Sequence, residues 1–145
     1  MRKIRRLLVA AAATTTLAVG LAFPTTGAAQ AQPPKTFTWN TVRSGDCTMF
    51  QNAKWILYPD GSAKFDATVT SSDNNDAWLM WPHIQDANKA DLGTLINFDV
   101  QNRNDWTEFV QNLPDHTERY RWTGHGRFDA SLFSLIKYMR LHNHC

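Results

Sequence analysis

The stretch "SAKFDATVT", residues 62–70, constrains the fold more than any other part of the chain. Apolar side chains at every second position, from Ala63 to Val69, alternate with polar or charged ones, which predicts a strand with one core face and one solvated face. Before it, Pro59-Asp60-Gly61-Ser62 predicts a tight turn, because Pro suits the first central position and Gly supplies a positive φ. Residues 53–58 are strand-like as well, so the sequence predicts an antiparallel hairpin.

The rest of the chain continues in this way. Further strands are expected at 36–41, 47–50, 77–81, 92–100, 117–122 and from 137 onward. Pro82 requires an edge strand or a bulge, because it lacks a backbone donor, and Gly124-His125-Gly126 is expected to break or bend its strand. Trp106–Val110 is ambiguous: three of its apolar side chains fit one helical turn, but the segment is short and Leu113-Pro114 closes it. Asp129 can cap a short helix. The fold class predicted is all-β (mainly β): a single small antiparallel β-sandwich or barrel of about seven or eight strands, with a short helical turn near the C-terminus.

Residues 1–31 have the features of a signal peptide. A basic start (MRKIRR) precedes an apolar run over 7–22, which is shorter than the roughly 20 residues that a membrane span needs. Ala29-Gln30-Ala31 has the form that a signal peptidase cuts, here before Gln32. Arg5-Arg6 fits a twin-arginine signal poorly, so ordinary secretion is expected. Residues 32–145 then form a single secreted β-rich domain that is extracellular and free of the membrane after cleavage.

Removing this leader reverses the sign of the charge. All 13 Asp and Glu lie after residue 31, whereas four of the 15 Lys and Arg lie before it. The mature chain therefore carries eleven basic against thirteen acidic groups, a formal charge of −2. Without net positive charge or a run of four basic residues, it lacks the electrostatic footprint of a nucleic-acid binder.

Two cysteines remain, Cys47 and Cys145. In an exported chain an even count predicts a disulfide, while two buried thiols or an intermolecular bridge are the alternatives. An intramolecular bond would close a loop of nearly the whole domain, which the chain-entropy model values at about 4 to 5 kcal/mol.

The aromatic residues pose the main functional question. The mature chain contains six Trp, and "AWLMW" at 77–81 cannot place all its apolar side chains on one strand face. Exposed Trp can stack on sugar rings or anchor protein contacts. Each of the ligand-binding candidates lies close in sequence to polar residues: Trp81, Trp106 and Trp122. The alternative is that these Trp fill a core that lacks long helices.

The polar motifs point to no specific cofactor or metal. His142 and His144 share one strand face, and a third metal ligand would have to come from His83, His116 or His125. Asp86-x-Asn88 and Asp73–Asp76 offer oxygen ligands, but neither supplies the Gly and Glu of a calcium-binding EF-hand loop. No serine has the G-x-S-x-G setting of a hydrolase nucleophile.

Three stretches carry a family resemblance: "DGSAKFDATVTSSDNNDAWLMW", "FVQNLPDHTERYRW" and "GRFDASLFSLIKYMRLHNHC". They resemble an uncharacterised family of small secreted actinobacterial proteins, a domain of unknown function, over nearly all of the mature chain. The resemblance implies export and a compact β-rich domain. It implies no activity and no catalytic residue.

These observations favour a monomeric, non-enzymatic binding module. Its ligand would be an extracellular glycan, a small hydrophobic molecule or another protein, such as a protease that it inhibits. The alternative is a small extracellular hydrolase that uses His116 or His125 with a nearby carboxylate. A structural role at the cell surface is disfavoured by the absence of repeats and of an anchor.

Overall fold

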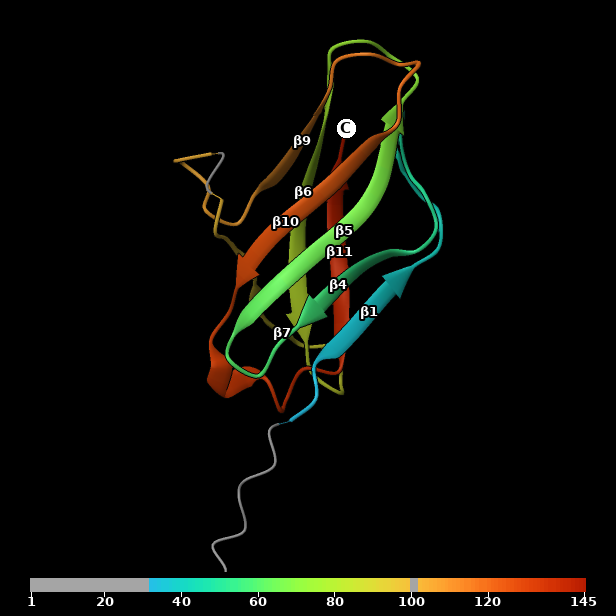
Figure 1. The fold of residues 1–145 in the computed structure, drawn as a ribbon. Helices are drawn as coiled ribbons and strands as arrows, with labels where there is room; N and C mark the ends of the chain where they lie inside the picture. Colours follow the sequence, from blue (N-terminus) through green and yellow to red (C-terminus); the bar gives the residue numbers. More distant parts are fainter. Residues whose placement is uncertain (1–31, 100–101) are drawn as a thin grey trace, which may run out of the picture. The chain divides into compact units, whose positions relative to one another are not determined.

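The computed structural model describes residues 32–99 and 102–145, so the signal peptide predicted for residues 1–31 lies outside the described part. Two antiparallel sheets, A and B, form a sandwich, and the only helical element described is the 3₁₀ turn η1 (Ala130–Leu132). Figure 1 looks onto sheet A, behind which the strands of sheet B run in a different direction. The all-β prediction is confirmed, and the fold is a sandwich rather than a closed barrel. Within the described ranges no helix is long and apolar enough to cross a membrane.

Sheet A is built around the hairpin that the sequence predicts. Its main path runs β1 (Lys35–Trp39), β4 (Ala53–Leu57), β5 (Ser62–Ser71), β10 (Tyr120–Arg127) and β8 (Ile96–Asn97), while β2 (Val42–Ser44) pairs with β3 (Cys47–Met49), and β3 pairs with β5. The turn between β4 and β5 has Gly61 at φ 84°. A side chain at this position would lie 2.6 Å from the Phe128 carbonyl oxygen. Glycine is therefore required here both by conformation and by space.

Sheet B is built around one long strand, β6 (Asp76–Gln85). β11 (Tyr138–His144) pairs along one side of it, whereas β9 (Phe109–Leu113) and β7 (Asp91–Thr94) follow one another along the other side. Pro82 lies inside β6, so the prediction of an edge strand or a bulge at this residue is wrong. The Pro82 carbonyl accepts from Leu95 N, on the side where β9 has ended at Met80 and β7 begins at His83. Proline has no backbone N–H to donate, and at this position an N–H would point into the gap between β9 and β7. No hydrogen bond between strands is therefore lost.

Two further sequence predictions differ from the structure, one at residues 92–100 and one at residues 106–110. The single strand expected at 92–100 is two strands, β7 and β8, because the chain leaves sheet B for sheet A at the buried Leu95. Trp106–Val110 contains no helical turn, and Phe109 begins β9 instead. Such short segments bring the described strands to eleven rather than seven or eight.

The core lies between the two sheets and is rich in aromatic rings. The Trp55 ring lies 5.1 Å from Phe65 and 5.2 Å from Phe109. On β6, Trp78 and Met80 are fully buried whereas Leu79 and Trp81 face outward, as strict alternation requires. Of the side chains in "AWLMW", those of Trp78 and Met80 therefore belong to the core.

β10 runs unbroken through Gly124-His125-Gly126, contrary to the predicted break. Both glycines face inward. A Cβ at Gly126 would lie 3.2 Å from the Trp55 ring, and one at Gly124 would lie 3.3 Å from Phe109. The glycines therefore make room for core rings while His125 between them faces solvent.

The C-terminal segment ties the two sheets together. Asp129 caps η1 by accepting from Ser131 N at 2.9 Å. β11 then brings Cys145 to Cys47, and the predicted disulfide joins them. Lys35 Nζ donates to the carbonyls of Phe133 and Ile136, which fixes the start of β1 to the turn before β11.

Candidate functional site

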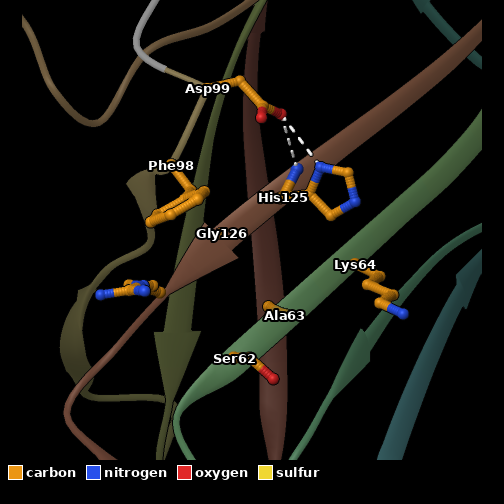
Figure 2. Close-up of a pocket in the computed structure, with 8 residues that line it drawn as sticks. Ser62, Ala63, Lys64, Phe98, Asp99, His125 and Gly126 are labelled. Carbon is orange, nitrogen blue, oxygen red and sulfur yellow. Dashed lines mark hydrogen bonds and ion pairs between the residues drawn. The ribbon is translucent and has the colours of Figure 1, made fainter.

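A hollow of about 440 Å³ opens on the outer face of sheet A. Figure 2 shows its walls, which come from the start of β5, the end of β10 and the segment that follows β8. Its lining residues are Ser62, Ala63, Lys64, Phe98, Asp99, His125, Gly126 and Arg127. The hollow therefore combines an apolar floor with basic side chains at its border.

His125 is held in place by Asp99. The Oδ2 atom of Asp99 accepts both the His125 backbone N–H and the ring nitrogen Nδ1, each at 3.2 Å (Figure 2). Phe98 N donates to the His125 carbonyl at 2.8 Å, which docks this segment against β10. Because a carboxylate accepts, Nδ1 carries the proton, and the other ring nitrogen lies on the side of the ring away from Asp99 (Figure 2).

Phe98 supplies an exposed aromatic surface beside a cation. Its side chain is 55% exposed, and the Arg127 guanidinium lies 4.3 Å from the ring centroid. The guanidinium lies over the ring, and among the described residues its N–H groups have no hydrogen-bond or ion-pair partner. An anionic group bound by Arg127 would therefore lie next to an apolar ring.

A second hollow of about 290 Å³ adjoins the first and shares Lys64 and His125 with it. The two hollows lie next to one another on β10, β5 and β4, and we call the pair the basic trough. Its charged residues and the aromatic ring at its end are Lys54, Lys64, Asp66, Phe98, Asp99, Arg121, His125 and Arg127.

The positive charge of the basic trough is only partly neutralised. Arg121 pairs with Asp66 at 3.1 Å, and this contact raises the pKa of the Arg121 guanidinium, through the hydrogen bond first and the opposite charge second. Lys54, Lys64 and Arg127 have no ion pair among the described residues. An excess of positive charge on one face is notable because residues 32–145 have a formal charge of −2.

For the hydrolase alternative, His125 is a candidate general base, but the serine that lines the hollow is hydrogen-bonded to another residue. His125 lies beside Asp99, whereas His116 Nδ1 contacts the amide oxygen of Asn74 at 2.8 Å and not a carboxylate. Ser62, which lines the hollow, donates its hydroxyl to Asp60 at 2.6 Å, and this bond lowers the pKa of the Asp60 carboxyl. In the strand register Ser62 lies opposite Arg127, two pairs along the strand from the pair of His125 with Lys64.

The three predicted Trp lie in different places. Trp122 is 2% exposed and packs its ring edge against Phe65, 5.1 Å away, so it belongs to the core and contributes no surface. Trp106 is 58% exposed, in the loop before β9. Trp81 lies on the outer face of sheet B, where its Nε1 donates to Asp105 at 2.8 Å. No common site brings these three side chains together.

Trp81 borders a separate hollow of about 320 Å³ with His83, Thr94, Thr107 and His142. The His142 ring meets Trp81 edge-on at 5.5 Å. Burial, followed by the positive charge of Arg140, lowers the pKa of His83 despite the opposing effect of Asp91. This hollow contains one rigid aromatic surface, and it is the strongest alternative to the basic trough for binding a ligand.

The polar groups considered for metals serve the fold in this structure. Asp86 accepts from the backbone of Asn88 and Ala90 and so closes its own turn. Among the described residues, the only group of three metal-type ligands within 4.8 Å of one another is Cys47, Asp76 and Cys145. Its two sulfur atoms are joined in the disulfide, and Asp76 accepts from Ser71 Oγ at 2.7 Å.

Sequence reasoning missed Lys64, Arg127 and Phe98 as site residues. Alternation along β5 places Lys64 outward, and the same alternation, continued through Gly124 and Gly126 in β10, places His125 and Arg127 on the same outer face. Nothing in the local pattern placed Phe98 beside them, because the crossing at Leu95 brings it there.

Comparison with known proteins gives a family without a known activity. The family model described as a family of unknown function, DUF6294, matches residues 54–145, which is more than half of the chain. No curated protein and no solved structure matches the chain. The chain therefore belongs to the DUF6294 family, whose function is unknown.

Proposed function

We propose that this protein is a secreted binding module that takes an acidic extracellular polysaccharide into the basic trough. The supporting observation is the outward row of Lys54, Lys64 and Arg127, none of them ion-paired among the described residues, beside the exposed ring of Phe98. Sugar rings present an apolar C–H face to aromatic side chains, and a uronate carboxylate pairs with lysine or arginine. The leader-like residues 1–31 and the disulfide support an extracellular location.

The length of the basic trough favours a chain over a single small molecule. Two adjoining hollows of about 440 and 290 Å³ share Lys64 and His125, so one ligand can pass from Arg127 across β5 to Lys54. A polymer with a charge on each sugar would place successive carboxylates along this row. A small hydrophobic molecule would leave the cations without partners.

The test compares polygalacturonate with the same polymer after methyl esterification, which removes the charge and keeps the sugar backbone. Calorimetry should detect binding of the acidic polymer, weakened by salt because the contacts are exposed charges. Binding of both polymers with equal affinity, or of neither, contradicts the proposal.

Two lysines in similar surroundings, one in the basic trough and one outside it, can show which surface binds the polysaccharide. Lys64 lies over the ring of Tyr58 at 5.8 Å, and Lys89 lies over the ring of Tyr138 at 5.7 Å, away from the basic trough. Lys64→Ala should weaken binding roughly three- to tenfold, as expected for one exposed charge contact. Lys89→Ala removes the same kind of side chain and should leave the affinity unchanged. If Lys89→Ala weakens binding and Lys64→Ala does not, the polysaccharide binds away from the basic trough.

Hydrolysis at the same place is a second candidate, favoured by the 3.2 Å contact between His125 Nδ1 and Asp99. With Asp99 orienting the ring, the second nitrogen could take a proton from an attacking water. Incubation with polygalacturonate should then release reducing ends, and His125→Gln should abolish the release. If the polymer binds but no reducing ends form, hydrolysis is excluded and the binding proposal is unaffected.

A further inference from the structure

A third hollow, of about 510 Å³, runs along the free edge of β11. It is bordered by Tyr138 and Arg140, which face away from the core, and also by Met139 and Leu141, which face toward it. Neighbouring residues of a strand point to opposite faces. Gln85 and Lys89 also border the hollow, beside Tyr138 at the start of β11, while Trp39 and Val42 border it from sheet A. We call this hollow the edge groove.

The backbone at this edge is open among the described residues. β11 pairs with β6 along one side, and no other described strand pairs with it. Every second residue of an edge strand directs its N–H and C=O away from its neighbour. Natural proteins usually cover such an edge, because it is a template for another strand.

The far wall of the edge groove is sheet A. Trp39 at the end of β1 and Val42 in β2 border it, and both are partly buried against the core. Lys35 and its contacts to Phe133 and Ile136 close one end of this side of the sandwich, and the Cys47–Cys145 disulfide closes the other. Between these two ties, apolar side chains of both sheets remain within reach of an added strand.

The charges at this edge select the occupant. Residues 136–144 contain no Asp or Glu but include Lys137, Arg140, His142 and His144. Asp91, which accepts from Arg140 at 3.2 Å and lies 3.7 Å from His83, is the carboxylate facing this row. A second copy pairing antiparallel about Leu141 would set Arg140 of one copy against His142 of the other, and residues 136–144 would bring no carboxylate to either arginine.

We propose that the edge groove binds an extended peptide that adds a strand to sheet B, with apolar residues facing Trp39, Met139 and Leu141 and acidic residues beside Arg140. The strand edge supplies backbone hydrogen bonds, and the alternating sides of the groove select alternating side chains. This site is distinct from the basic trough and does not depend on the polysaccharide proposal.

The test uses a synthetic peptide of about eight residues in which Val and Glu alternate. Two controls keep the backbone and change one property: a Val/Lys peptide reverses the charge, and a peptide with all Val before all Glu removes the alternation. The alternating acidic peptide should bind at least about tenfold more tightly than either control. It should also slow hydrogen exchange of the β11 amides. Equal affinities, or protection confined to sheet A, overturn the proposal.

Backbone pairing has a readout of its own. N-methylation at alternate residues of the peptide should abolish binding in one of the two possible sets and be tolerated in the other, because only one set donates to β11. If both sets bind equally well or both fail, the peptide does not pair as a strand.

Two protein variants locate the contact. Arg140→Glu should reverse the preference toward the Val/Lys peptide, whereas Lys64→Ala in the basic trough should leave both affinities unchanged. Loss of peptide binding in Lys64→Ala would mean that the acidic peptide binds the basic trough instead. A dimer that forms through β11 and excludes the peptide would also overturn the proposal, and sedimentation of the free protein detects it.

Discussion

Gly126→Ala tests the packing between the sheets. The added Cβ would lie 3.2 Å from Trp55 Cζ3, 3.3 Å from Leu95 Cδ1 and 3.4 Å from Trp55 Cη2. Trp55 and Leu95 are both 0% exposed, so neither can move aside toward solvent. Overpacking of a filled core costs about 1 to 3 kcal/mol, and replacing Gly stabilises by up to about 1 kcal/mol through the unfolded chain. We therefore expect a net loss of about 1 to 2 kcal/mol in the free energy of unfolding, or about 4 to 8 °C in Tm.

Gly124→Ala is the matched comparison on the same strand. A Cβ there meets one atom at 3.3 Å, on Phe109, and its next neighbours at 3.6 Å. The loss should be smaller than at Gly126. Urea denaturation followed by Trp fluorescence measures both variants, and an unchanged m-value would show that the denatured state is the same. If Gly126→Ala is as stable as the parent protein while Gly124→Ala is not, the proposed packing is wrong.

Three further outcomes follow from single contacts. Replacing both Cys47 and Cys145 by Ala opens a loop of sequence separation 98 and should lower the free energy of unfolding in urea by up to about 4 to 5 kcal/mol; a loss under about 1 kcal/mol would contradict the assigned role of the disulfide. Folding lowers the pKa of His83 from its ordinary value of 6.5, so below that pH the unfolded chain binds more protons than the folded protein does. The free energy of unfolding should therefore fall as the pH drops from about 7 to about 5, and His83→Gln should reduce this pH dependence. Trp78 Nε1 donates to an Asn side chain, whereas the buried Trp55 Nε1 has no partner among the described residues, so Trp78→Phe should cost about 1 kcal/mol more than Trp55→Phe in the same denaturation assay.

Local chemistry predicted much of the fold. The Pro59–Ser62 turn and the alternation of β5 are present as expected, because a turn with a positive φ and a half-buried strand are both specified by neighbouring residues. The disulfide followed from the cysteine count and the expected compartment. These features required no knowledge of which strands meet.

The errors arise where a residue depends on elements far away in the chain. Pro82 is tolerated in a central strand because two separate strands leave an interruption beside it. Gly124 and Gly126 serve ring packing from β4 and β9 rather than a bend. Trp122 has polar sequence neighbours, which favour a surface site, yet neighbours in a strand point to opposite faces, so Arg121 is exposed and Trp122 is buried.

The candidate site was the least predictable part. Its cations lie on strands that are adjacent only in the folded sheet, since Lys64 and His125 become neighbours through the pairing of β5 with β10. Phe98 and Asp99 join them because the chain crosses between the sheets. Period-two patterns assign a face to each residue, but they do not bring strands side by side.

The most direct test of the basic trough is a chemical-shift map of isotope-labelled protein comprising residues 32–145, titrated with a short galacturonate oligosaccharide. The proposal predicts that the largest changes lie at the amides of Lys64, His125 and Arg127, and that they diminish as salt is added. Changes centred on Trp81 and His142, on the outer face of sheet B, would contradict it. So would a titration that moves no amide on either face.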